Sequence, residues 1–263
     1  MNAMVRDKRL VARSFSRAAA TYDSVAGLQR SVADALLARL PQGSPGVVLD
    51  LGSGTGYASE TLRRRYPQAL LLSLDLAEGM LGYARSRQPL TSHHHICGDA
   101  EALPLADNSV DLIYSSLAIQ WCEQPLDLFA ELRRVLKPGG QLLIATLGPE
   151  TLIELKQAWA RVDDDRHVNE FCPLLALRAA AAGLASLDES IERRVLEYDH
   201  LSELMHELKA LGAHNVNPRQ QQGLSGISRL RTLSRAYDEL RLENGALPAS
   251  YEVYYLAWMK DSA

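Results

Sequence analysis

The stretch Val47–Gly56, which reads VVLDLGSGTG, constrains the fold more than any other part of the sequence. Its apolar first half has the composition of a buried strand, and Gly52, Gly54 and Gly56 follow before helix-like sequence begins. Glycine permits a tight turn and lets a ligand approach the backbone closely. The pattern predicts a strand, a turn and a helix at the start of a nucleotide-binding α/β domain.

The spacing of these glycines differs from that of a dinucleotide-binding turn. A G-x-G-x-x-G fingerprint would place its third glycine one residue later, where this chain has Tyr57. A pyrophosphate is therefore not expected at the start of the helix. The spacing is typical of sites that bind a nucleoside joined to methionine.

Apolar, strand-like runs alternate with helical stretches as far as Leu147. The runs after VVLDL are ALLLSLD, HHHICGD, DLIYSSL and GQLLIATL, and YEVYYLAWM closes the chain as an edge strand or an inserted strand. Strands that alternate with helices imply right-handed crossovers and a parallel sheet covered on both faces. We predict a Rossmann-like, doubly wound α/β fold with a mostly parallel sheet of seven strands.

Changes in this rhythm divide the chain into four segments. The expected segments are an N-terminal helical lid (1–46), a cofactor-binding core (47–147), a helical insertion capping the active site (148–188) and a C-terminal part that completes the sheet (189–263). The two helices of the lid are expected to meet around residues 21–24. Within the C-terminal part, a helical segment at 219–244 is expected over the site. The first strand after the core is expected near Ile191.

Composition and charge narrow the class of protein. The formal net charge is -4 and 47% of the residues are hydrophobic, so we expect a globular domain with no global positive field for nucleic acid or a membrane. The N-terminus lacks the apolar core of a signal peptide, and no run is long enough to span a bilayer, so a cytoplasmic location is expected. A monomer is expected as well.

Cysteines and histidines give no metal or disulfide signature. Cys97, Cys122 and Cys172 are odd in number and far apart, so we expect reduced thiols. The run His93–His95 lies in a strand-like segment, where consecutive side chains point to alternate faces and cannot converge on one ion. We therefore expect no metal site.

Acidic residues end the second and third predicted strands. A carboxylate at Asp75 can accept hydrogen bonds from both ribose hydroxyls. Asp99 can accept one from an adenine amine, while the backbone N–H of Ala100 meets a ring nitrogen. Because the carboxyl ends of parallel strands share one edge of the sheet, these groups should line one crevice with the glycine turn. The alternative for Asp75 is a helix cap for the helix expected near Ala77.

Taken together, VLDLGSGTG, Asp75, GDAEALPL and FAELRRVLKPGG resemble class I S-adenosylmethionine-dependent methyltransferases over residues 47–147. Four patches outside the cofactor motif, FSRAAATYDSVAGLQRSVADALLARLP, SSLAIQWC, HVNEFCP and ELKALGAHNVN, resemble the malonyl-acyl carrier protein O-methyltransferase family, which starts pimelate-chain assembly for biotin. The resemblance implies methyl transfer from S-adenosyl-L-methionine to the free carboxylate of malonyl-acyl carrier protein, or of malonyl-CoA, with S-adenosyl-L-homocysteine as the second product.

The resemblance also implies roles for individual residues. Tyr22 would close over the methionine half of the cofactor and Phe171 would line the acceptor side, so these two are the positioning residues of the catalytic step. The cofactor residues implied are Tyr22, Gln29, Asp50, Gly52, Gly54, Gly56, Asp75, Leu76, Asp99, Ala100, Ser116 and Leu117. The acceptor residues implied are Gln120, Trp121 and Phe171. Core packing is the alternative for both aromatic side chains of the acceptor group.

The chemistry of a carboxylate acceptor requires no general base. With a pKa of about 4 the group is ionised at neutral pH, so catalysis would come from alignment and from removal of water. Lys209 and Arg231 are the candidate cations for recognising the carboxylate, with a solvated helix-face charge as the alternative for each.

An acidic carrier would dock on a local basic cluster. The candidates are Arg63–Arg65, Arg133 and Arg134 with Lys137, and Arg219 with Arg229, Arg231 and Arg235. The last is favoured because it belongs to the segment expected to cap the site. Two other functions stay open: a methyltransferase for a small free carboxylic acid such as trans-aconitate, and a non-methylating assembly factor like those of mitochondrial complex I.

Overall fold

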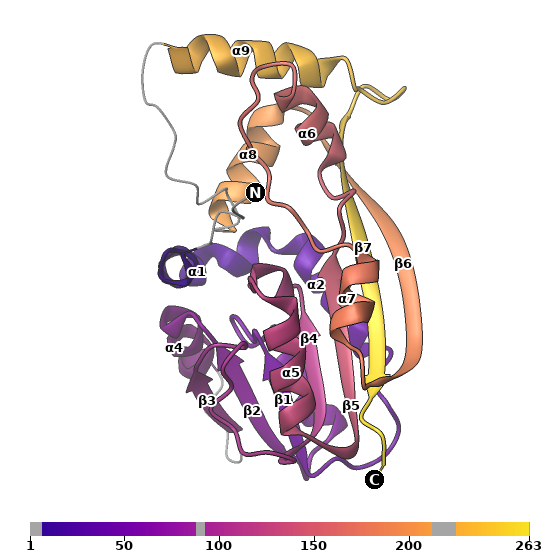
Figure 1. Ribbon diagram of the computed structural model, residues 1–263. Coiled ribbons are helices and arrows are strands. Elements are labelled where there is room, and N and C mark those ends of the chain that lie inside the picture. Colours follow the sequence, from indigo (N-terminus) through magenta and orange to yellow (C-terminus); the bar gives the residue numbers. More distant parts are fainter. Residues whose placement is uncertain (1–6, 88–92, 212–224, 263) are drawn as a thin grey trace.

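The computed structural model describes residues 7–87, 93–211 and 225–262. Its centre is one seven-stranded sheet in the order β3-β2-β1-β4-β5-β7-β6 (Figure 1). The strands are β1 (Val47–Leu51), β2 (Leu70–Asp75), β3 (His93–Cys97), β4 (Val110–Ser116), β5 (Leu136–Leu147), β6 (Ala185–Tyr198) and β7 (Leu247–Met259). The first five are parallel, and β7 is antiparallel to β5 and β6. The predicted Rossmann-like, mostly parallel sheet of seven strands is confirmed.

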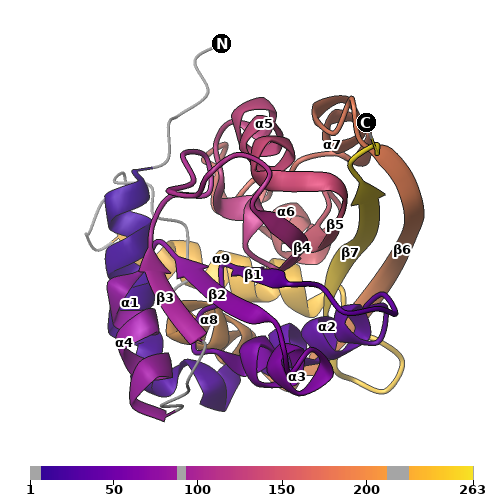
Figure 2. The same ribbon diagram turned by 90° about the horizontal axis from the view of Figure 1, so that it is seen from below.

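Helices cover both faces of this sheet. The helices of the described residues are α1 (Lys8–Val25), α2 (Gly27–Leu37), α3 (Tyr57–Arg65), α4 (Glu78–Arg87), α5 (Pro125–Val135), α6 (Ile153–Trp159), α7 (Leu174–Ala180), α8 (Leu201–Ala210) and α9 (Ser225–Asp238), with a 3₁₀ turn η1 (Ile119–Trp121). Figure 2 shows α2 and α3 on one face of the sheet and α5 and α7 on the other. The layered arrangement follows from the crossovers between parallel strands.

The side chains of β1 alternate between the two faces of the sheet, and both faces are covered by helices. Val48 packs in the cluster that contains α2 and α3, and its neighbour Leu49 packs in the cluster that contains α5 and α7. Both side chains are buried, at 1% and 0% exposure. Successive strand residues point to opposite faces, so a strand that is covered on both sides must be apolar throughout.

Three sequence-based boundaries differ from the structure. The run YEVYYLAWM is the inserted strand β7, paired on one side with β5 and on the other with β6, so the edge-strand alternative was wrong. β6 begins at Ala185 and not near Ile191, since its charged, half-exposed first half hides the strand pattern. The corner between the first two helices lies at Ala26 and not at residues 21–24, which form the last turn of α1.

A second group of helices lies beyond the carboxyl ends of the parallel strands. In Figure 1, α1 crosses above these ends, with α8 and α6 above it and α9 farthest from the sheet. α1 packs against α4 and α8, and α6 packs against α9. Among the described residues, no helix is both long and apolar enough to cross a membrane.

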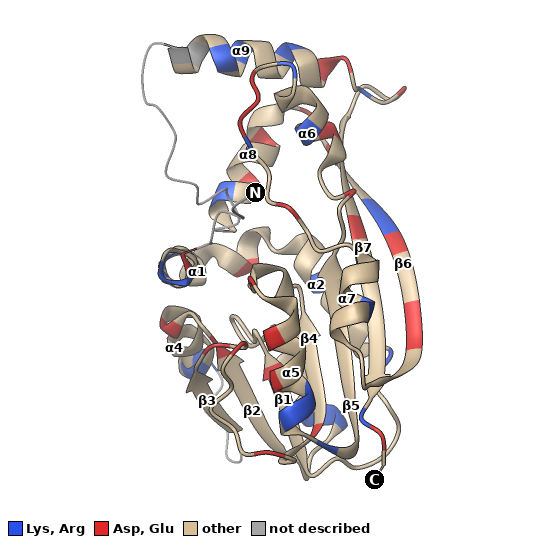
Figure 3. Cartoon of the chain, in the orientation of Figure 1, with Lys and Arg blue, Asp and Glu red and all other residues tan. Residues whose placement is uncertain are grey.

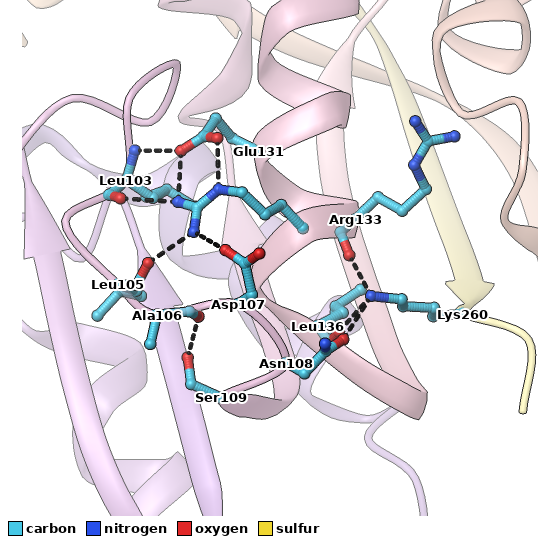
Figure 4. Close-up of polar contacts among 11 residues, drawn as sticks. Leu103, Leu105, Ala106, Asp107, Asn108, Ser109, Glu131, Arg133, Leu136 and Lys260 are labelled. Carbon is cyan, nitrogen blue, oxygen red and sulfur yellow. Dashed lines mark hydrogen bonds and ion pairs between the residues drawn. The ribbon is translucent and has the colours of Figure 1, made fainter. Parts of the chain in front are cut away.

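A polar network fixes the loop before β4 to α5. The Arg134 guanidinium donates to both carboxylate oxygens of Glu131, at 2.7 and 2.8 Å, to Asp107 at 2.7 Å, and to two loop carbonyls (Figure 4). Nearby, the Lys260 ammonium donates to the carbonyls of Arg133 and Leu136 at 2.8 Å. These contacts tie the end of β7 and the loop to one helix.

Candidate functional site

The turn after β1 forms the floor of a cleft at the strand ends. Gly52 and Gly54 have φ values of +72° and +55°, where a side chain is strained. A Cβ at Gly52 would stand 2.1 Å from the Ala118 Cβ, so the loop after β4 packs directly on the turn. A Cβ at Gly54 would find no atom within 4 Å. The backbone at Gly54 is therefore open to a ligand.

Asp75 ends β2 beside this turn. Its Oδ2 accepts a hydrogen bond from the Gly54 N–H at 2.9 Å, and its Oδ1 accepts one from the Ala77 N–H at 2.7 Å. Burial raises the pKa of this carboxyl, against the opposing effect of these backbone bonds. A carboxylate can accept about four hydrogen bonds. Asp75 thus fixes the turn that precedes α4 through the Ala77 N–H, without bonding an N–H of the helix itself, and retains lone pairs for hydroxyl groups.

Asp99 is held by a residue that the sequence reading missed. The Lys8 ammonium of α1 lies 2.5 Å from Asp99 Oδ2 and also bonds Glu101. Burial lowers the pKa of Lys8, but the hydrogen bonds and charges of the two carboxylates raise it more, so it stands above its ordinary value. Lys8 therefore fastens the start of α1 over this end of the cleft.

Aromatic side chains of α1 and η1 meet above the turn. The ring centroid of Phe15 lies 6.4 Å from that of Tyr22 and 5.1 Å from that of Trp121, both in edge-to-face geometry. Burial raises the pKa of the Tyr22 phenol, and Asp75 and Asp23 add to the shift. Tyr22 is thus a neutral, packed residue of the last helical turn.

Two neighbouring cavities share this aromatic wall. The strand-end cleft, of about 850 Å³, lies over the glycine turn and Asp75. The helical pocket, of about 670 Å³, lies on the other side, against α8 and Phe171. The residues common to both are Phe15, Tyr22, Leu117 and Trp121. A molecule in one cavity can therefore meet a molecule in the other at this wall.

Most residues expected at the cofactor line the strand-end cleft. They are Tyr22, Gly52, Gly54, Asp75, Leu76, Asp99, Ala100, Ser116 and Leu117. The residues expected at the acceptor that line the helical pocket are Gln120, Trp121 and Phe171. The structure brings these two sets together from segments far apart in the chain.

Other predicted residues lie elsewhere. Gln29 lines the helical pocket and not the strand-end cleft, and its buried Oε1 has no hydrogen-bond partner among the described residues. Gly56, at φ +83°, precedes α3 and lines neither cavity. Lys209 and Arg231 are exposed on α8 and α9 and line neither cavity, so the structure does not bring them to an acceptor's carboxylate.

Asp50 is buried beneath the cleft and does not line it. Its side chain accepts a hydrogen bond from Ser59 Oγ at 2.6 Å, and Ser59, Ser73 and His93 continue as a bonded chain at 3.0 and 2.8 Å. Burial raises the pKa of Asp50 to about 7, and burial lowers that of His93 to about 4. Asp50 therefore ties β1 to α3, the two elements that flank the glycine turn. Its position in a strand did not indicate on which side of the backbone its side chain would lie.

The wall of the helical pocket carries no charge. Every described residue that lines it is uncharged, including Gln29, Gln120, Thr151 and Asn169. A cation stands just behind: the Lys156 ammonium lies 5.6 Å from the Phe171 ring centroid and donates to the Pro149 carbonyl at 2.6 Å. Burial lowers the pKa of Lys156. No motif pointed to this lysine, because its neighbours in α6 are an ordinary helical sequence.

Among the described residues, one group has the geometry to hold a metal ion, namely Asp163, Asp165 and His167. The Arg229 guanidinium bonds Asp163 and lies 3.6 Å from Asp165, so a cation already faces these carboxylates. The His167 ring stacks on Trp159 at 3.5 Å. The group joins α9 to the loop after α6. None of the cysteines Cys97, Cys122 and Cys172, all within the described residues, takes part in a disulfide.

Comparisons with known proteins agree with this geometry. Residues 49–144 match the family described as "Methyltransferase domain". A malonyl-acyl carrier protein O-methyltransferase of Laribacter hongkongensis is 45% identical over 266 residues, which are 96% of this chain and 89% of that protein. The biotin biosynthesis bifunctional protein BioHC of Cellvibrio japonicus is 52% identical over 257 residues, 97% of this chain and 50% of that protein. The chain thus spans about half the length of the bifunctional relative.

Solved structures share the fold at low identity. The YcgJ protein of Bacillus subtilis superposes with a TM-score of 0.64 at 19% identity, covering 89% of this chain and 99% of that one. A putative methyltransferase from Bacillus halodurans superposes with a TM-score of 0.65 at 18% identity, covering 88% of this chain and 100% of that one. These likenesses bear on the fold alone.

Proposed function

This chain belongs to the malonyl-acyl carrier protein O-methyltransferase family, and from that premise we propose that it transfers a methyl group from S-adenosylmethionine to the free carboxylate of malonyl-acyl carrier protein. The products are the malonyl methyl ester and S-adenosylhomocysteine. The name of the Cellvibrio japonicus relative connects that protein with biotin biosynthesis, and we propose that the ester made here serves the same pathway. The free-acid and assembly-factor alternatives are not favoured by these names.

The residues of the strand-end cleft fit the nucleoside half of S-adenosylmethionine. The open space at Gly54 admits a group against the backbone, and Asp75 keeps lone pairs for ribose hydroxyls. At the other end, Asp99 and the Ala100 backbone line the cleft where an adenine edge would lie. When bound there, the cofactor supplies a methyl group on a positively charged sulfur. Tyr22 and Leu117, in the shared wall, would flank that methyl.

The helical pocket suits an ionised carboxylate that must remain reactive. A nucleophilic carboxylate is slowed by a tight salt bridge and by hydration, and the uncharged wall of this pocket provides neither. Gln29 and Gln120 can orient the group through amide N–H donors, and Phe171 excludes water from one side. Lys156, behind Phe171, adds a weak attraction without direct contact.

The observation that carries the proposal is the wall that Phe15, Tyr22, Leu117 and Trp121 present to both cavities. Transfer by in-line displacement needs the methyl and the attacking oxygen held about 3 to 3.5 Å apart across such a boundary. Since the carboxylate is already ionised at neutral pH, these residues need to align the reactants and not to remove a proton.

The proposal is tested by the choice of acceptor. We would measure kcat/KM for radiolabelled methyl transfer to malonyl-acyl carrier protein, malonyl-CoA, free malonate and trans-aconitate. We expect the carrier-bound acceptor to be preferred by at least about tenfold over any free acid. Higher kcat/KM with trans-aconitate would favour the free-acid methyltransferase, and no transfer to any acceptor would leave the non-methylating alternative.

A further inference from the structure

Helix α1 has two faces of opposite character. Its inner face carries Phe15 and Tyr22, which line both cavities. On its outer side, Arg9, Arg13 and Arg17 follow at intervals of four residues and are all exposed. Side chains four positions apart lie above one another on a helix, so the three guanidinium groups form one row, the arginine stripe. Among the described residues, no ion pair to any of the three is found.

The basic clusters on the α/β core are already engaged. In the cluster at the end of α5, Arg134 is held by Glu131 and Asp107 (Figure 4). Lys137, which follows at the start of β5, lies 2.8 Å from Asp111. In the cluster that ends α3, Arg65 donates to Gln42 at 2.7 Å and Arg64 lies 3.6 Å from Glu60. Carboxylates thus compensate Arg134, Lys137 and, more weakly, Arg64, while Arg65 is held by a neutral amide; both clusters are tied to their own neighbours.

The arginines of the cluster on α9, which the sequence favoured for docking, do not form one unpaired surface. Arg229 is bound to Asp163 in the ion-pair group described above, and Arg219 lies outside the described residues. Arg231 and Arg235 are exposed, but α9 lies at the far end of the molecule, with α8 between it and α1 (Figure 1). This surface does not border either cavity.

We propose that the arginine stripe, together with Lys209 of α8, docks the acidic face of the acyl carrier protein. The inference rests on the proposed function, since it takes the carrier as the acceptor's anchor. Lys209 is exposed and directly follows Leu208, which lines the helical pocket, and α8 packs against α1. Figure 3 shows the basic residues of α1 and of the end of α8 on the same side of the molecule.

Charge complementarity identifies the partner. The protein has a net charge of -4, so an acidic protein is repelled overall and would be attracted only by a locally basic surface such as these four residues. Within α1, Asp23 is the only acidic residue, and it pairs with Arg87 at 2.8 Å. A carrier seated on the outer side of α1 would hold its flexible arm beside the wall that the two cavities share.

The chain offers a matched pair of variants for the test. Arg13→Glu/Arg17→Glu reverses two exposed arginines four residues apart on α1, and Arg231→Glu/Arg235→Glu does the same on α9. We would measure the dissociation constant of malonyl-acyl carrier protein with S-adenosylhomocysteine present, so that no transfer occurs, and KM for the carrier and for malonyl-pantetheine. We expect the α1 variant to weaken carrier binding and raise KM for the carrier about tenfold.

The control measurements distinguish failure of the docking proposal from failure of the proposed function. KM for malonyl-pantetheine, which lacks the carrier surface, should stay within about twofold of wild type, as should every constant of the α9 variant. Equal carrier affinity in the wild type and the α1 variant would overturn the docking surface, as would a larger loss in the α9 variant or equal losses for both acceptors. Carrier binding through α1 without methyl transfer by the wild type would instead overturn the proposed function.

Discussion

The strand-end cleft and the helical pocket are built in different ways. The cleft takes its key groups from consecutive strand ends, and backbone hydrogen bonds of 2.9 and 2.7 Å hold Asp75 to Gly54 and Ala77. The pocket gathers side chains from α1, α2, η1, α8 and β7, whose positions depend on how separate elements pack. A site held by backbone is set by local sequence, whereas a site held by side chains is set by tertiary contacts.

The largest expected effect concerns the support beneath the cleft. Asp50 has a pKa of about 7 in the folded state against 3.8 unfolded, so from pH 4 to 7 the unfolded chain loses this proton first and stability falls as pH rises. Asp50→Asn keeps an acceptor for Ser59 and removes the charge. We expect its stability relative to wild type to increase by about 2 kcal/mol between pH 5 and pH 8.

Urea unfolding of both proteins across this range checks the prediction. Ser59→Ala, which removes the donor and leaves the carboxyl, is the control and should keep the wild-type trend with pH. Parallel stability curves for Asp50→Asn and wild type would show that the buried carboxyl is already ionised in the folded protein at pH 5.

The next effect separates the two cavities. Asp75→Ala removes charged hydrogen bonds at the cleft, and we expect it to weaken S-adenosylhomocysteine binding by about 1 to 3 kcal/mol, measured by calorimetric titration. Phe171→Ala, the counterpart in the pocket, should leave that affinity unchanged and raise KM for the acceptor. Similar cofactor affinities for Asp75→Ala and wild type, in folded protein, would remove Asp75 from the cofactor site.

A substitution in the wall shared by the two cavities should change the rate of methyl transfer more than the binding of either reactant. Tyr22 packs with Phe15 between the cavities, so Tyr22→Ala should slow methyl transfer about tenfold at saturating cofactor and acceptor, with a smaller change in stability. Tyr22→Phe, which keeps the ring, should retain most of the rate. Turnover of the alanine variant at the wild-type rate would show that alignment does not depend on this ring.

The smallest effect concerns the cation behind the pocket. Lys156 does not touch the cavity, so Lys156→Met should raise KM for malonyl-pantetheine only about threefold, an effect below about 1 kcal/mol, with kcat unchanged. Arg231→Met on α9 is the matched control and should leave KM as it is. A larger rise in KM for Arg231→Met than for Lys156→Met would favour Arg231, as the sequence suggested, as the cation that recognises the carboxylate.

The contrast between the cavities also explains what the sequence could predict. The glycine turn and Asp75 follow buried strands, and strand ends of a parallel sheet always share an edge, so these residues were placed from pattern alone. Lys8 and Lys156 were missed because a lysine in an ordinary helix carries no signal of its partner. Lys209 and Arg231 were misplaced at the site since the facing direction of a helix depends on its packing.

The fold shows the same limit. Alternating strands and helices predicted the sheet up to Leu147, but β7 entered the sheet between β5 and β6 through antiparallel pairing that no local pattern specifies. The half-exposed edge strand β6 was predicted too short, because its first half, ASLDES, is polar and exposed and has too few apolar residues to show a strand pattern. Long-range pairing decides both features.

The most direct test of the central claim, that this chain methylates a carrier-bound malonyl carboxylate, is a single-turnover assay with radiolabelled S-adenosylmethionine and two carriers. Malonyl-acyl carrier protein has the free carboxylate, and acetyl-acyl carrier protein has the same thioester without it. We predict label in the malonyl group only, released as methanol by mild alkali as an ester requires. Label on the acetyl carrier, label that resists alkali, or no label on either carrier would contradict the account.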